Sequence, residues 1–166
     1  MTDLAVIHDT FAIERTYPAS PSRVFAAFAT RAAKDAWNGD EPADPAVPAT
    51  PAAQNPDEEF DFRVGGHERF AMTYQGIGYR YDACYYDIVQ DQRLVYSYEM
   101  YADGARISVS VATIEFAATA GGTGTGTTLT WTEQGAYLDG FDGAEASSLR
   151  QGGTEEMLDG LAKYLS

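Results

Sequence analysis

The stretch from Phe60 to Tyr101 constrains the fold most strongly, because it holds eleven of the twenty-one aromatic residues in short alternating runs. Phe60-Asp61-Phe62 and Tyr96-Ser97-Tyr98 are two of them. Alternation with a period of two predicts β-strands with one covered and one wet face. Tyrosine joins a large apolar ring to a hydroxyl that needs a partner when buried. Such a sheet can line a partly polar cavity, form a core, or present an outer contact face.

Further strands are predicted on both sides of this stretch, at residues 5–17 and at a last segment that places Leu129 and Trp131 on one side. Turns with glycine or aspartate separate the intervening strands, at 64–67, 76–78, 91–92 and 102–104. The strand at 106–116 changes phase, because Ile107, Val109 and Val111 point one way and Ile114 and Phe116 the other. This change predicts a β-bulge near Ala112.

Two short helices are predicted after the first strand, and one long helix at the C-terminus. Ser20 with Pro21 starts the first helix, and Thr30 caps the second, which runs to Trp37. The closing helix ends near Leu165, and its apolar stripe contains Met157, Leu158, Leu161 and Leu165. The pair Gly152-Gly153 is expected to kink this helix or to let it approach the sheet. Helices on one side of an antiparallel sheet make an α+β fold.

Composition limits the function classes. At 166 residues a single domain spanning 1–166 is expected, with a Pro/Ala-rich loop insertion at 41–58 that holds five of the seven prolines. The net charge of -14 argues against nucleic-acid partners and anionic membrane surfaces. The N-terminus has no secretory pattern, no stretch is long enough for a membrane span, and a single cysteine allows no internal disulfide. We therefore expect a cytoplasmic protein.

Several ordered segments together resemble a known family. They are Tyr17–Phe28 with Trp37, Asp61–Gly66, Asp87–Val89 with Arg93–Tyr96, Thr132–Gly140 and Leu158–Leu161. Their order and spacing are similar to the START-like (Bet v 1-like, helix-grip) superfamily. The branch that they resemble more closely is the bacterial one related to the C-terminal domain of the activator of Hsp90 ATPase, often called SRPBCC proteins. The chain departs from this pattern in its 41–56 loop and at Glu155-Glu156.

The resemblance implies a helix-grip fold: a curved antiparallel sheet of six to seven strands around a long C-terminal helix, with two short helices after the first strand. It also implies a cavity between sheet and helix. Members of the superfamily bind hydrophobic small molecules, act as enzymes such as polyketide cyclases, or assist a chaperone in the stress response.

No metal or cofactor motif is expected. The two histidines and the single cysteine, Cys84, have no metal-ligand spacing, and Cys84 is interpreted as a small half-buried side chain. The glycine run at 121–126 fits no GxGxxG register, and the chain has no Walker A or GxSxG motif. The prediction is therefore no metal and no cofactor.

The predicted ligand-contacting residues are the large apolar side chains of the covered face and their neighbours from the helices. They are Trp37, Phe62, Phe70, Met72, Tyr81, Tyr85, Tyr96, Tyr98, Trp131 and Met157. Polar contacts are considered at His67, Arg69 and Glu133. Alternation favours an outward direction for His67 and Arg69. Glu133 shares the parity of Trp131, so it either lies at a cavity mouth as an acid or base, or it caps or pairs with an arginine.

Three functions follow, in order of preference. The first is binding of a small hydrophobic or aromatic molecule between sheet and helix. The second is a protein-interaction role, as a chaperone cofactor or a homodimer. The third is a cyclase or hydrolyase, which is ranked last because no acid/base pair is recognisable from spacing.

Overall fold

The alternating segments of the sequence form strands of one antiparallel sheet. The computed structural model describes residues 5–38, 58–120 and 125–166, so the predicted loop at 41–58 and the glycine run at 121–126 fall largely outside the described residues. Seven strands in those ranges are ordered β1-β7-β6-β5-β4-β3-β2. They are β1 (Val6–Tyr17), β2 (Glu59–Phe60), β3 (His67–Tyr74), β4 (Ile77–Val89), β5 (Arg93–Ala102), β6 (Ala105–Ala118) and β7 (Thr127–Leu138).

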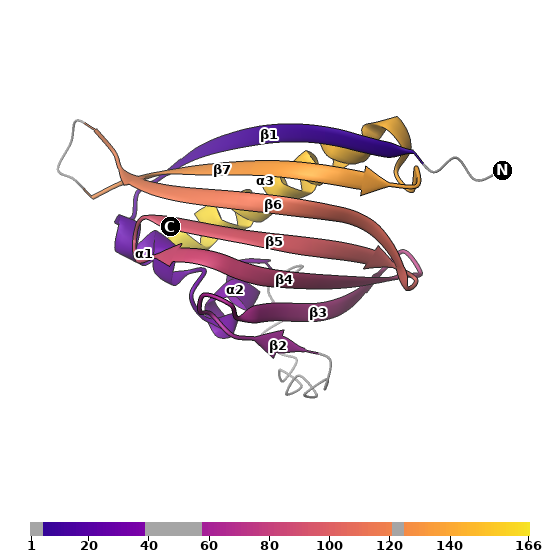
Figure 1. Ribbon diagram of the computed structural model, residues 1–166. Coiled ribbons are helices and arrows are strands. Elements are labelled where there is room, and N and C mark those ends of the chain that lie inside the picture. The colour runs from indigo at the N-terminus through magenta and orange to yellow at the C-terminus, as the bar shows by residue number, and fades with distance from the viewer. Residues whose placement is uncertain (1–4, 39–57, 121–124) are drawn as a thin grey trace.

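The helices lie where the capping signals place them. Ser20 caps α1 (Pro21–Ala26) by accepting a hydrogen bond from the Arg23 N–H. Thr30 Oγ1 accepts one from the Ala33 N–H at the start of α2 (Arg31–Asn38). A short 3-10 helix, η1 (Gly143–Glu145), leads into α3 (Ala146–Leu165). Figure 1 shows α3 crossing one face of the curved sheet, which we call the inner face. The predicted α+β helix-grip fold is confirmed.

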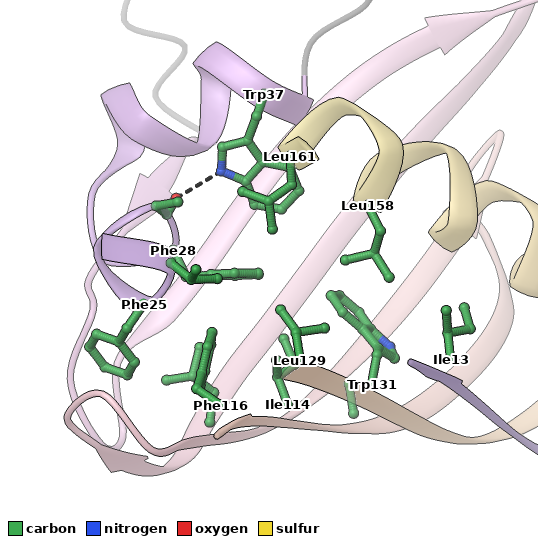
Figure 2. Packing of buried hydrophobic residues seen from close by; sticks show 14 of the residues in the cluster. Ile13, Phe25, Phe28, Trp37, Ile114, Phe116, Leu129, Trp131, Leu158 and Leu161 are labelled. Atoms are coloured by element: carbon green, nitrogen blue, oxygen red, sulfur yellow. Dashed lines mark hydrogen bonds between the residues drawn. The ribbon is translucent and has the colours of Figure 1, made fainter. Parts of the chain in front are cut away.

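The core lies between the inner face, α3 and the two short helices. Figure 2 shows Leu158 and Leu161 of α3 above Leu129 and Trp131 of β7. Trp37 of α2 closes one end, and its Nε1 donates a hydrogen bond of 2.8 Å to the Ala27 carbonyl oxygen. All five side chains are at most 5 % exposed, so this part of the inner face is filled by close-packed apolar groups.

The phase change in β6 occurs at a different place from the predicted one. The β5–β6 ladder pairs Tyr101 with Arg106 and Met100 with Ser108, which leaves Ile107 as the extra residue of a β-bulge. The bulge predicted near Ala112 is therefore wrong. Beyond Ile107 the even-numbered residues face inward, so Ser108 and Ser110 are buried. Val109 and Val111 point outward and are 37 % and 40 % exposed.

The close approach of α3 to its neighbours also differs from the expectation. Helix α3 continues through Gly152 and Gly153, and a Cβ at either position would meet no atom within 4 Å. At Gly160, however, a Cβ would lie 2.4 Å from the Trp37 carbonyl oxygen. The glycine that permits α2 and α3 to pack is therefore Gly160.

Matched alanine substitutions on α3 test this packing. We expect Gly153→Ala to raise the free energy of unfolding by about 0.5–1 kcal/mol, because alanine is the better helix former in open space. Gly160→Ala should lower it by about 1–3 kcal/mol, because the added methyl group forces α2 away from α3. Urea denaturation followed by circular dichroism measures both. Equal changes in the two variants would contradict the close approach.

Candidate functional site

Three side chains of the inner face form a partly exposed row across neighbouring strands. The register pairs Phe70 of β3 with Tyr81 of β4, and Tyr81 with Met100 of β5. The rings of Phe70 and Tyr81 stack with centroids 4.8 Å apart. All three side chains are half-buried, whereas the next inner residues of β4 and β5, Ala83 and Tyr98, are buried. We call Phe70, Tyr81 and Met100 the open row.

A buried carboxylate lies near one end of the open row. Glu133 of β7 is fully buried, and charge in such a place needs partners. Tyr98 Oη donates a hydrogen bond of 2.5 Å to its Oε1, and Trp131 Nε1 donates one of 3.3 Å to its Oε2. Arg150 Nη1 of α3 lies 3.5 Å from Oε1. The arginine partner that the sequence left as one alternative for Glu133 is therefore Arg150.

Arg150 connects α3 to two further strands. Its Nη1 donates a hydrogen bond of 2.7 Å to Tyr98 Oη, and its Nη2 donates one of 2.8 Å to Ser108 Oγ. The guanidinium carbon lies 5.3 Å from the ring centre of Tyr98 and 5.5 Å from that of Tyr137. The side chain is 17 % exposed, so its charge is mostly shielded from water. We call Glu133, Tyr98, Trp131, Ser108 and Arg150 the polar cluster.

Tyr137 borders the polar cluster with an unsatisfied hydroxyl. Its ring lies over Gly135, where a Cβ would come within 2.8 Å of the Tyr137 hydroxyl oxygen. The hydroxyl is buried and has no hydrogen-bond partner among the described residues, although Ser147 of α3 is near it. An unpaired buried hydroxyl is uncommon, and it leaves a free donor beside Arg150.

A second buried carboxylate holds α2 against the sheet. Glu68 of β3 is 3 % exposed, and Lys34 Nζ of α2 donates to both of its oxygens at 2.8 and 2.7 Å. Tyr85 Oη of β4 donates a third hydrogen bond of 2.7 Å. Because three donor contacts satisfy this carboxylate, its role is to fix α2 beside the open row.

His67 and Arg69 lie on the outer face, away from the open row. Arg69 Nη1 is 2.9 Å from Glu59 Oε2, and its Nε is 3.1 Å from Asp82 Oδ1. His67 Nδ1 lies 3.4 Å from Arg69 Nη2 and 3.9 Å from the same Asp82 oxygen. Successive side chains of a strand point to opposite faces, so the inward Glu68 and Phe70 require this outward placement.

The other predicted contact residues fall into separate places. Tyr98 belongs to the polar cluster. The apolar core and its edge contain Trp37, Phe62, Tyr85, Tyr96, Trp131 and Met157. Met72 lies two residues beyond Phe70 and is 45 % exposed. It borders a surface depression of about 560 Å³, whose other lining residues include Ala71, Thr73, Arg80 and Tyr101. Ring contacts join Tyr96 to Tyr98, Trp131 and Tyr85, so the structure brings most of the predicted set together. Met72, His67 and Arg69 lie apart from it.

Sequence reasoning missed Arg150, Ser108, Glu68 and Lys34. A signal for Arg150 exists, because it lies eight residues before Leu158 and therefore continues the inward stripe of α3. Glu68 shares the parity of Phe70 and was open to the same reasoning. No group of three or more histidine, cysteine, aspartate or glutamate side chains in ranges 5–38, 58–120 and 125–166 is arranged to hold a metal ion.

Substitutions at Arg150 test the polar cluster. We expect Arg150→Met to lower the free energy of unfolding by about 3–5 kcal/mol, because it leaves the buried Glu133 without its cation. The double variant Arg150→Met/Glu133→Gln should recover most of the loss, since it removes both charges, and the glutamine amide can accept from Trp131 with its oxygen and donate to Tyr98 Oη with its nitrogen. Urea denaturation measures each change. A double variant as unstable as the single one would argue against a charge-paired Glu133.

The buried tyrosines should make the fold sensitive to alkali. Burial raises the pKa of Tyr17 to about 12 and raises the pKa values of Tyr85 and Tyr98 further. Above pH 10 the unfolded chain releases phenol protons that the folded chain retains, so stability falls as pH rises. These residues should not affect stability below pH 10. Urea titrations from pH 8 to 12 with phenolate absorbance at 295 nm measure this, and ionisation of these phenols without unfolding would contradict it.

Comparison with known proteins places the chain in a family. Residues 18–166 match the family described as activator of Hsp90 ATPase homolog 1-like protein. The crystal structure of the Mll3558 protein from Rhizobium loti is 42 % identical, with 97 % of this chain and 99 % of that one covered and a TM-score of 0.77. For an uncharacterised protein from Rhizobium leguminosarum the identity is 37 %, the covered shares are 97 % and 96 %, and the TM-score is 0.78.

More distant structures share the fold alone. DynU16, from the dynemicin biosynthetic locus, is 19 % identical over 95 % of this chain and 47 % of its own, with a TM-score of 0.58. No curated protein matches the chain. Within the described residues, none of the helices has the length and apolar character that a membrane span requires. With a family match over nearly its whole length, the chain belongs to the activator of Hsp90 ATPase homolog 1-like family, within the SRPBCC (Bet v 1-like) superfamily.

Proposed function

We propose that this protein binds a small hydrophobic or aromatic molecule on the inner face of its sheet, against the open row of Phe70, Tyr81 and Met100. The observation that carries the proposal is the half-buried stack of Phe70 and Tyr81 at the edge of the covered part of the inner face. Apolar surface held near a core and still reachable by solvent is typical of ligand sites.

The chemistry of the row suits a flat apolar ligand. The Phe70 and Tyr81 rings are nearly parallel, with an interplanar angle of 23°. The Tyr98 ring centre lies 5.1 Å from that of Tyr81, and the Arg31 guanidinium carbon lies 5.9 Å from that of Phe70, so a flat ligand would pack against the exposed edges of these rings. Aromatic pairs in such arrangements contribute about 0.5–1.5 kcal/mol beyond the area that they bury. Met100 adds a flexible, polarisable side chain that adapts to ligands of different outline.

Binding is favoured over catalysis because neither buried carboxylate near the row, Glu68 or Glu133, is free to react. Glu133 is fully buried, and Tyr98, Trp131 and Arg150 surround its two oxygens. A general acid or base must reach the substrate proton within hydrogen-bond distance. Held as it is, Glu133 serves to position Tyr98 and Arg150.

A second candidate function is an interaction with another protein chain, which the family description suggests. Val109 and Val111 support it, because they are exposed side by side on the outer face of β6. Their exposed area is small beside the roughly 800 Å² per partner of a standard interface. We therefore rank it below ligand binding.

Titration with the neutral dye N-phenyl-1-naphthylamine tests the first proposal. We expect saturable binding with enhanced fluorescence. Phe70→Ala should weaken it about tenfold, because a stacking ring is lost. Tyr86→Ala is the matched control, since Tyr86 lies on β4 but is 62 % exposed at a bulge. Equal affinities in wild type and Phe70→Ala would overturn the site. Absence of dye binding with a dimer in sedimentation would favour the second candidate.

A further inference from the structure

We infer that the ligand of the open row carries a neutral hydrogen-bond acceptor, such as a ketone or quinone carbonyl oxygen, and that Arg150 donates to it. This inference rests on the proposed function, because it assigns the chemistry of the ligand at the same site. It starts from the donors that Arg150 does not use.

The guanidinium of Arg150 has more donors than its neighbours accept. Arginine carries five N–H groups. Nη1 donates to Tyr98 Oη and lies 3.5 Å from both Ser110 Oγ and Glu133 Oε1. These three acceptors occupy the two hydrogens of Nη1. Nη2 donates to Ser108 Oγ alone. Among the described residues, Nε and the second hydrogen of Nη2 therefore have no acceptor. The side chain is 17 % exposed, so part of the guanidinium can still be reached from solvent by a ligand.

The sheet register brings these donors to the end of the open row. Phe70, Tyr81 and Met100 are paired in sequence across β3, β4 and β5, and Met100 is paired with Ser108 of β6. Ser108 is the residue to which Nη2 is bonded. A ligand that packs against Tyr81 and Met100 would therefore meet Arg150 at Ser108, about one strand spacing of 4.8 Å beyond Met100. The Tyr137 hydroxyl, which has no hydrogen-bond partner among the described residues, lies over Gly135, the residue paired with Ser110 in the β6–β7 ladder.

The charges around Arg150 favour a neutral acceptor over an anion. Glu133 Oε1 lies 3.5 Å from Nη1 and already balances the guanidinium charge. A carboxylate ligand bound to Arg150 would face this buried carboxylate, and like charges in a poorly solvated place repel strongly. The net charge of -14 opposes the approach of an anion as well. A carbonyl oxygen takes the free N–H groups without adding charge.

Three naphthalenes of nearly equal shape test the inference by displacing N-phenyl-1-naphthylamine from the wild-type protein. They are 2-acetylnaphthalene, the isosteric alkene 2-isopropenylnaphthalene, and 2-naphthoate. We expect the ketone to bind about tenfold more tightly than the alkene, because its oxygen accepts from a charged donor. The carboxylate should bind more weakly than the ketone.

The double variant Arg150→Met/Glu133→Gln assigns the effect to the guanidinium. It should still bind the dye, and the preference for ketone over alkene should disappear. Arg63→Met is the matched control, because Arg63 is 68 % exposed and lies in the turn before β3. It should keep the preference.

The outcomes separate the two proposals. Equal affinities for ketone and alkene, or tightest binding of the carboxylate, would overturn the neutral-acceptor inference and leave dye binding at the open row intact. A preference that survives in the double variant would overturn the assignment to Arg150. If the double variant does not fold, the comparison of the three compounds on the wild-type protein still decides the chemistry of the ligand. If the dye does not bind, both proposals fail.

Discussion

The arrangement of this protein depends on how one buried carboxylate is satisfied. Apolar packing holds α3 on the sheet but is not directional, so it permits small shifts along the face. Glu133 removes that freedom, because its oxygens need the Tyr98 hydroxyl, the Trp131 indole and the Arg150 guanidinium in defined positions. The three partners come from β5, β7 and α3. The place where the helix crosses the sheet is therefore fixed by hydrogen bonds that would be costly to leave unmade.

The open row stays partly exposed because polar contacts fix two helices, α3 and α2, at defined places on the sheet. Arg150 holds the first half of α3 over β5 and β6, while Lys34 and Glu68 hold α2 over β3. Between these two contacts the open row of Phe70, Tyr81 and Met100 is left half-buried. Two buried carboxylates thus fix where the helices lie on the sheet, and a patch of apolar surface stays partly uncovered.

The sequence predicted the fold well because its signals are local or carried by the family. Strand alternation, the Ser20 and Thr30 caps and the stripe ending at Leu165 each concern neighbouring residues. The site was predicted in part. Alternation predicts the inward direction of Phe70 and Tyr81. The bulge at Ile107, however, reverses the side of the sheet to which Ser108 and the residues after it point, and alternation counted from Ile107 misses this. Arg150 and Glu133 come from α3 and β7, which are distant in the sequence. Sequence periodicity predicts which face a residue lies on, but it does not predict which residue of another element a long side chain will contact.

The bulge at Ile107 has a consequence for how relatives of this protein can diverge. If the hairpin after Tyr101 were one residue shorter and the bulge were kept, Val111 in place of Ser110 would lie opposite Tyr98. The acceptors of Arg150 would move to the solvent side, and valines would line the same place. Deletion of a single residue in an exposed turn would thus replace a polar end of the site with an apolar one, without any substitution on the inner face. Hairpin length, as much as residue identity, sets the preference of such a site.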